Sequence, residues 1–126
     1  MNNDSLVLRA AYRDTSVLLE GDAEAPLEDA MLAEPNLAST LLKVGHHGSL
    51  TSTHPDFLAA VSPTWAVISC GRRNRFHHPR PEILSELQAA HTLTFRTDTD
   101  GASCFLLNGQ SGPTAVTPQP MCASDP

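Results

Sequence analysis

Short apolar runs of strand type alternate along this sequence with segments of helical periodicity, and this alternation limits the possible folds more than any other feature. Two of the runs, TLLKV and WAVISC, are almost wholly apolar, as expected for strands covered on both faces. The predicted strands are residues 6–12, 16–20, 40–44, 65–70, 93–96 and 102–107, and the predicted helices are residues 24–33, 55–61 and a segment beginning at Pro81. The order β-β-α-β-α-β-α-β-β predicts an α/β domain with a mixed sheet and flanking helices.

Two boundaries are also predicted. Residues 13–15 separate the first two strands, a spacing that fits a hairpin with a three-residue loop. After Asn108 the sequence is rich in Pro, Gly, Ser and Thr, which leaves little to bury. We therefore expect a folded part over residues 3–108 and a disordered tail over residues 109–126.

The charge balance excludes some functions. The chain has 126 residues, with 14 acidic and 8 basic side chains and a net charge of −6. Only one basic residue is a lysine, so a surface that holds nucleic acid by charge alone is not expected. An enzyme acting on phosphodiesters is still allowed, because bound divalent cations supply positive charge. No stretch approaches the ~20 apolar residues of a membrane span, so no membrane contact by this chain itself is expected.

Polar clusters follow three of the predicted strands, where sites form in α/β sheets. The first is Gly21-Asp22. Asp22 is a candidate metal-bridging carboxylate, and the alternative is a helix N-cap, for which Asp is a preferred residue.

The second cluster is GHHGS, residues 45–49. On an extended backbone His46 and His47 would point to opposite sides, so only one would face a given metal unless the strand has already turned. Gly45 and Gly48 would allow the backbone to approach an ion or phosphate closely, and Ser49 is a candidate donor to a substrate oxygen.

The third cluster is GRRNRFHHPR, residues 71–80. A histidine here could donate to a leaving oxygen or position a phosphate, and the arginines could contact phosphate groups. A basic loop with a solvated histidine is the alternative. Outside these clusters we expect His54 to be an N-cap or surface residue, His91 to be a solvent-exposed helix end, and Asp98 and Asp100 to form a turn.

The runs NNDSLVLR, LLEGDAE, LLKVGHHGSLTSTHPDFLAAVSPTWAVISCG, NRFHHPRPEIL and RTDTDGA, within residues 3–107, together resemble the C-terminal part of the metallo-β-lactamase-like domain of ComEC-type competence DNA-uptake proteins. The resemblance implies the second half of an αββα sandwich with a two-metal site, zinc or manganese. It implies Asp22 as a bridging ligand and one of His46 and His47 as a further ligand, with His47 favoured.

The resemblance also bears on the remaining site residues. We expect catalytic roles for His46 and His78 and substrate contacts for Ser49, Asn74 and Arg75. His78 matches a position in the family's NRYGHPHPE-type loop, in which His77 replaces a glycine and Arg80 replaces a second histidine. No role of that second histidine is carried over.

The family's main metal motif, H-x-H-x-D-H, has no match in this sequence. We therefore expect part of a phosphodiesterase or nuclease domain that is inactive without an N-terminal half. The expected partners are that half, DNA or another phosphodiester as substrate, and a second copy of the chain. The alternative is a non-catalytic interaction module. A ComEC-like protein would place the domain on the extracytoplasmic side of the membrane; otherwise a soluble cytoplasmic protein is expected.

Overall fold

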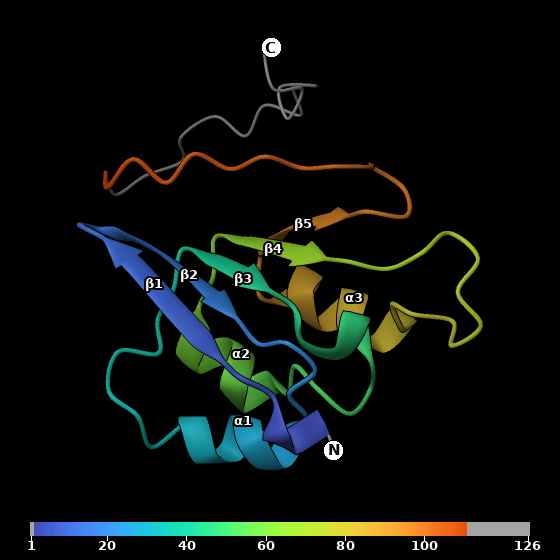
Figure 1. The fold of residues 1–126 in the computed structure, drawn as a ribbon, viewed down its shortest axis with the longest axis horizontal. Helices are drawn as coiled ribbons and strands as arrows, with labels where there is room; N and C mark the ends of the chain where they lie inside the picture. Colours follow the sequence, from blue (N-terminus) through green and yellow to red (C-terminus); the bar gives the residue numbers. More distant parts are fainter. Residues whose placement is uncertain (1, 111–126) are drawn as a thin grey trace.

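The computed structural model describes residues 2–110, and the predicted tail lies outside the described residues from residue 111 onward. Five strands form one sheet in the order β1-β2-β3-β4-β5 (Figure 1). β1 and β2 are antiparallel and the other neighbours are parallel, which confirms the predicted mixed sheet. The elements are η1 (Asn2–Asp4), β1 (Leu8–Tyr12), β2 (Thr15–Leu19), α1 (Ala25–Met31), β3 (Leu41–Lys43), η2 (Gly45–Gly48), α2 (Pro55–Val61), β4 (Trp65–Ile68), α3 (Pro81–Ala89) and β5 (Leu93–Arg96).

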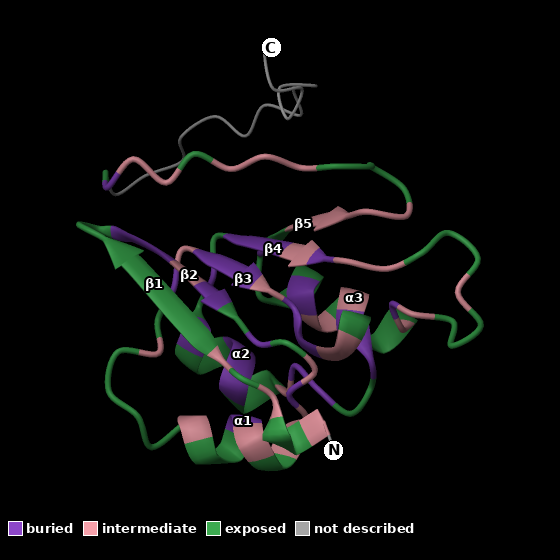
Figure 2. Cartoon of the chain, in the orientation of Figure 1, coloured by how far each residue is buried: buried purple, intermediate pink, exposed green. Residues whose placement is uncertain are grey.

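All three α-helices lie on the same side of the sheet (Figure 1). Pro26, Pro55 and Pro81 each occupy the first turn of a helix, where a missing N–H breaks no helical hydrogen bond. Leu18, Leu42 and Ala66 form one row across the sheet and point into the core beneath it. Figure 2 shows this layer between sheet and helices as the buried part of the molecule. The main hydrophobic core therefore lies between the sheet and the three α-helices.

The opposite face of the sheet is also apolar, and only part of it is covered. Its next row is Val17, Leu41, Trp65 and Leu93, because side chains alternate between faces along a strand. Phe105 packs its ring 6.0 Å from that of Trp65 and 5.3 Å from that of Phe95. Toward both edges the face is open, with large exposed side chains at Leu8, Tyr12, Leu19 and Leu93.

One predicted strand is absent and one predicted loop length is wrong, and several other predicted elements are shorter than expected. Residues 102–107 do not form a strand. Phe105 holds this segment over the sheet face, where no strand edge offers backbone partners, and Gly109 then bonds to Asp14 and Thr15. The hairpin loop has two residues rather than three, since Tyr12 pairs with Thr15 and the left-handed φ of Arg13 (52°) closes the tighter turn. No helix within residues 2–110 has the length and apolar character of a membrane span.

Candidate functional site

The three polar clusters meet at one edge of the sheet, as predicted from the strand order. β2, β3 and β4 are parallel neighbours, so their carboxyl ends lie side by side. Asp22 follows β2, His47 lies in η2 directly after β3, and Ser69 follows β4. The helix α1 is capped at Glu24, so the N-cap alternative for Asp22 is wrong.

Asp22 and His47 face each other across this edge. His47 Nε2 lies 3.4 Å from Asp22 Oδ1, and both side chains are about half exposed. The other ring nitrogen of His47, Nδ1, lies 2.7 Å from the carbonyl oxygen of Ser69. A carbonyl only accepts hydrogen bonds, so Nδ1 carries the proton. Nε2 of the neutral ring then carries a lone pair and faces Asp22 Oδ1, which is also an acceptor. Two acceptors at this distance attract each other only if a proton or a cation lies between them.

The backbone turns before it reaches the two histidines. β3 ends at Lys43, and His46 and His47 both have left-handed angles, with φ of 42° and 58°. Their rings approach to 6.4 Å between centroids, and the His46 ring is 5.9 Å from that of His78. The opposite orientation expected for an extended backbone does not apply, because the strand has already ended.

The two glycines of the GHHG segment make room for protein atoms. A Cβ on Gly45 would lie 2.7 Å from Glu20 Oε2, and a Cβ on Gly48 would lie 2.7 Å from Pro79 Cβ. Gly48 also has a φ of +79°, which side chains rarely adopt. These glycines therefore allow the histidine segment to pack closely between the β2 end and the loop at residues 71–80.

His46 is held by a polar cluster that the sequence did not reveal. Glu24 Oε1 accepts hydrogen bonds from Asn2 Nδ2 (3.1 Å) and Thr51 Oγ1 (2.9 Å) and lies 3.2 Å from His46 Nδ1. The hydrogen bond from Asn2, followed by that from Thr51, lowers the pKa of Glu24. A charged Glu24 thus orients the His46 ring.

Two buried glutamates lie beneath the histidine segment, and sequence reasoning missed both. Glu28, on α1, accepts hydrogen bonds from the backbone N–H groups of Thr53 and His54 and is fully buried. Glu20 is also fully buried, and neither of its oxygens has a hydrogen-bond partner. Burial, reinforced by the charge of Glu28, raises the pKa of Glu20 to about 9, so Glu20 is uncharged at neutral pH. The only signal in the sequence was an acidic residue at the end of an apolar strand.

The third cluster forms a loop closed by Asn74. Its amide nitrogen donates to the carbonyl oxygens of Gly71 (2.8 Å) and His78 (2.7 Å), and its Oδ1 accepts from His78 N–H (2.9 Å). Asn74 thereby fixes His78, whose Nδ1 is buried without a partner. Burial, then the charges of His46 and His47, lower the pKa of His78, so its neutral form predominates near pH 7.

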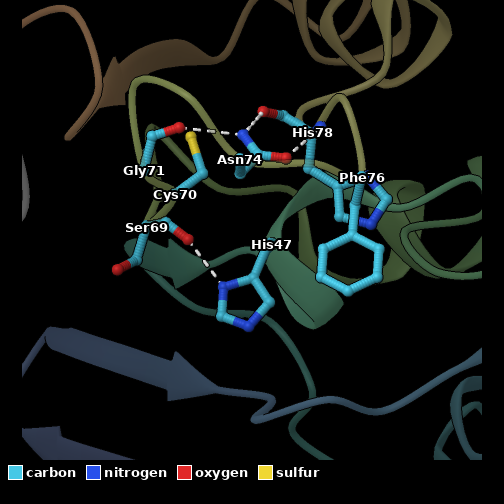
Figure 3. A pocket seen from close by; sticks show the side chains of 7 residues that line it. All are labelled: His47, Ser69, Cys70, Gly71, Asn74, Phe76 and His78. Atoms are coloured by element: carbon cyan, nitrogen blue, oxygen red, sulfur yellow. Dashed lines mark hydrogen bonds between the residues drawn. The ribbon is translucent and has the colours of Figure 1, made fainter.

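A pocket of about 320 Å³ opens between η2 and this loop (Figure 3). The Phe76 ring lies parallel to that of His78, with 5.9 Å between centroids and 17° between planes, and Arg75 places its guanidinium 4.9 Å from the Phe76 centroid. The lining residues are His47, Ser69, Cys70, Gly71, Asn74, Phe76 and His78.

The other candidates are placed as follows. Ser49 is buried and its hydroxyl lies 3.1 Å from that of Thr51, outside the pocket lining. The substrate contacts predicted for Ser49, Asn74 and Arg75 remain predictions. His54 is the N-cap of α2 without a side-chain capping bond, and Asp98 and Asp100 bond to Arg96 in the turn after β5.

The residues of this edge fit part of a metal site. Two ligands of one tetrahedral zinc, with bonds of about 2.1 Å, lie about 3.4 Å apart, the separation of Asp22 Oδ1 and His47 Nε2. Ring nitrogens bound to backbone carbonyls, as in His47, are typical of metal-ligating histidines. No group of three or more His, Cys, Asp or Glu side chains within residues 2–110 is arranged to hold a metal ion.

Fold and site together define an α/β protein with a candidate functional site at the carboxyl ends of its parallel strands. The chain is 39% identical over 118 residues to ComE operon protein 3 of Bacillus subtilis, covering 93% of the chain and 15% of that protein. It is 38% identical over 113 residues to Competence protein ComA of Neisseria gonorrhoeae, covering 88% of the chain and 16% of that protein. It is 37% identical over 100 residues to Recombination protein 2 of Haemophilus influenzae, covering 79% of the chain and 13% of that protein.

The chain therefore spans a small part of the length of these curated relatives. No protein-family model matches it.

Proposed function

We propose that this chain supplies one ligand set of a metal-dependent phosphodiesterase site in a protein of DNA uptake. The observation that carries the proposal is the Asp22–His47 pair, in which an imidazole lone pair and a carboxylate oxygen converge at 3.4 Å. The name of the Neisseria relative, a competence protein, supports the association with DNA uptake.

The proposed fold is the second half of a metallo-β-lactamase-like αββα sandwich. The open apolar face of the sheet supports it, because a sheet in a sandwich buries both faces, one against helices and one against a second sheet. Trp65 and Leu41 already lie buried on that face, whereas Leu93 and Leu19 stay exposed. The N-terminal half of the domain would cover the exposed part and bring the remaining metal ligands.

Each residue of the edge has a role in this proposal. Asp22 and His47 would hold the metal, zinc or manganese, through Oδ1 and Nε2, and Ser69 keeps the His47 proton on Nδ1. Divalent metals bound at this edge would supply an activated water and would stabilise charge on a phosphoryl oxygen. Glu24 keeps His46 oriented beside His47. His78 is neutral near pH 7 and so is ready to accept a proton at the edge of the pocket.

Titration of the chain with Mn²⁺, followed by calorimetry and by electron paramagnetic resonance of free Mn²⁺, tests the ligand assignment. We expect weak binding by the chain alone and tighter binding when the N-terminal half is added in trans. Asp22→Asn and His47→Gln should each lower the affinity by more than about 10-fold, because the loss of even an outer partner of a metal ligand costs that much. His91→Gln, an exposed histidine outside the three clusters, is the matched control.

Hydrolysis of a chromogenic phosphodiester by the reconstituted pair is the second measurement. Loss of hydrolysis in Asp22→Asn, with retained activity in His91→Gln, is the expected result. Unchanged Mn²⁺ affinity in both Asp22→Asn and His47→Gln would refute the metal assignment.

A second candidate function, a non-catalytic interaction module, is favoured by the open sheet face alone. Leu8, Tyr12, Leu19 and Leu93 present apolar surface that a second copy of the chain could cover. Light scattering over a range of concentrations distinguishes the two. A dimer that Leu19→Lys dissociates, together with absent metal binding, would favour this candidate.

A further inference from the structure

The loop at residues 71–80, here called the arginine loop, concentrates positive charge in an acidic chain. Arg72, Arg73, Arg75 and Arg80 are four of the eight basic side chains, and the chain as a whole has a net charge of −6. Within residues 2–110 no carboxylate forms an ion pair with Arg72, Arg73 or Arg75. Arg72 Nε already donates to the carbonyl oxygen of Asp98, so Arg73 and Arg75 carry the guanidinium groups that are available to an anionic ligand.

The same loop presents an aromatic ring beside the candidate metal ligands. Phe76 is 59% exposed and lines the pocket together with His47 (Figure 3). One neighbour of the ring is His78, which lies parallel to it, and another is the guanidinium of Arg75. A flat ligand that covered the exposed ring would remove apolar surface from water, which is favourable.

From this arrangement we infer that the Phe76 ring stacks on an unpaired nucleobase of a single-stranded nucleic acid, while Arg75 contacts the adjoining phosphate. The inference rests on the proposed function, because that phosphate would lie next to the Asp22–His47 pair. Every base has a π-face, so stacking on Phe76 requires no particular sequence. A base within a duplex is already stacked on its neighbours and cannot use this ring without leaving the helix.

The charge of the ligand follows from the charge of the loop. A phosphodiester strand offers one anionic group per nucleotide, which suits several arginines spaced along one loop. A neutral aromatic ligand would leave the arginines unused, and a non-aromatic phosphodiester would leave Phe76 exposed. A strand that alternates phosphate and aromatic base satisfies both.

The chain contains a matched control for this pair. Arg13 places its guanidinium 5.3 Å from the centroid of the Tyr12 ring, and Tyr12 is 55% exposed. This second pair sits in the β1–β2 turn, at the opposite end of the strands from the pocket. If any exposed aromatic–arginine pair bound nucleic acid, Tyr12 would contribute as much as Phe76.

The experiment measures fluorescence anisotropy of two labelled oligonucleotides with the whole chain, in the presence of a chelator. One is a short oligothymidylate, and the other has the same length and charge but abasic sites. We expect the base-bearing strand to bind about tenfold more tightly. Phe76→Leu should abolish this difference, Phe76→Tyr should retain it, and Tyr12→Leu should leave it unchanged. Arg75→Gln should weaken both strands.

Equal affinity of the native chain for the two strands would overturn the inference, as would tighter binding of a duplex of the same sequence. A base preference that survives Phe76→Leu would overturn the role of Phe76. Because the measurement excludes metal, its failure is separable from failure of the metal assignment, which Asp22→Asn tests. Asp22→Asn should leave the base preference intact.

Discussion

The two ends of the parallel strands make an instructive comparison. At the amino end lies a pocket of about 410 Å³, and at the carboxyl end lies one of about 320 Å³. The polar groups of the larger pocket are paired with each other: Ser16 N–H donates to Thr40 Oγ1, Thr40 N–H donates to Ser16 Oγ, and Arg9 donates to the Ala38 carbonyl. Pocket size alone therefore does not identify the candidate site.

The carboxyl end differs because several of its buried polar atoms lack partners. Within residues 2–110, most of the buried side-chain atoms without a hydrogen bond lie at or beside this edge: both oxygens of Glu20, His78 Nδ1, Arg80 Nε and Thr53 Oγ1, with Glu86 Oε2 on α3 as the exception. A buried polar atom without a partner costs about 1–3 kcal/mol. An edge that keeps several such atoms is organised for something other than its own stability, which is typical of functional sites.

The largest expected effect comes from Glu28, the one fully paired carboxylate beneath this edge. Glu28→Ala should destabilise the fold by about 3–5 kcal/mol, because it leaves the buried N–H groups of Thr53 and His54 without an acceptor. Urea unfolding measures the loss. Glu34→Ala, an exposed glutamate, serves as control. A loss below about 1 kcal/mol would show that the segment at residues 45–54 does not depend on Glu28.

Glu20→Gln should change how stability varies with pH. The pKa of Glu20 is raised from 4.5 to about 9 in the folded chain, so its contribution is present in full below pH 4.5 and is lost as pH rises toward 9. Glutamine does not titrate. The free energy of unfolding of the variant, relative to the native chain, should therefore increase by on the order of 1 kcal/mol per pH unit across this window.

Urea unfolding of both proteins at pH 5, 7 and 9 measures this change. If the difference in free energy of unfolding were the same at all three pH values, Glu20 would have an ordinary pKa. The carboxyl end of the sheet would then differ less from the amino end.

At the amino end, Thr40→Val removes one partner of the reciprocal pair with Ser16. We expect a loss of about 1 kcal/mol, since a single hydrogen bond contributes this much. Mn²⁺ affinity should not change, because Thr40 lies at the other end of β3 from His47. Thermal unfolding measures the loss of stability, and the Mn²⁺ titration measures the metal affinity. A changed metal affinity in Thr40→Val would show that the two ends of the strands are not independent.

The smallest effect concerns the turn after β5. Arg96 donates to both oxygens of Asp98, and these hydrogen bonds lower the pKa of Asp98 below its ordinary 3.8. Its stabilisation is therefore present above pH 3.8 and is lost as pH falls through the lowered pKa. Asp98→Asn should cost about 0.5 kcal/mol at pH 7 and progressively less as pH falls below 3.8. Urea unfolding of Asp98→Asn and of the native chain at several pH values measures the difference. Equal stability of the two proteins at pH 7 would contradict this prediction.

Local pattern predicted much of the fold. The helix Pro55–Val61 and the strand Leu93–Arg96 have the predicted bounds, because proline punctuation and apolar periodicity are local signals. The strand predicted at residues 102–107 is absent because Phe105 packs onto a sheet face and the segment does not extend the sheet. Apolar character predicts burial both for a strand within the sheet and for a segment that packs onto a sheet face, so it does not distinguish the two.

The candidate site divides in the same way. Asp22, His46, His47 and His78 were predicted to share the carboxyl edge, because topology places strand ends together. Glu20, Glu24 and Glu28 were missed, because an acidic residue carries no sequence signal of burial or of the partner it will meet. Their roles depend on contacts with Gly45, Thr51 and Thr53, each more than twenty residues away.

By itself, then, the sequence determined the three α-helices, the five strands of the mixed sheet and the edge at which polar clusters gather, since these follow from periodicity within short windows and from strand order. Tertiary structure alone decided that the histidine backbone turns left-handed, that His47 directs Nε2 toward Asp22, and that Phe76 stands exposed beside them. These depend on loop angles and on contacts between distant residues, which short-range patterns do not encode.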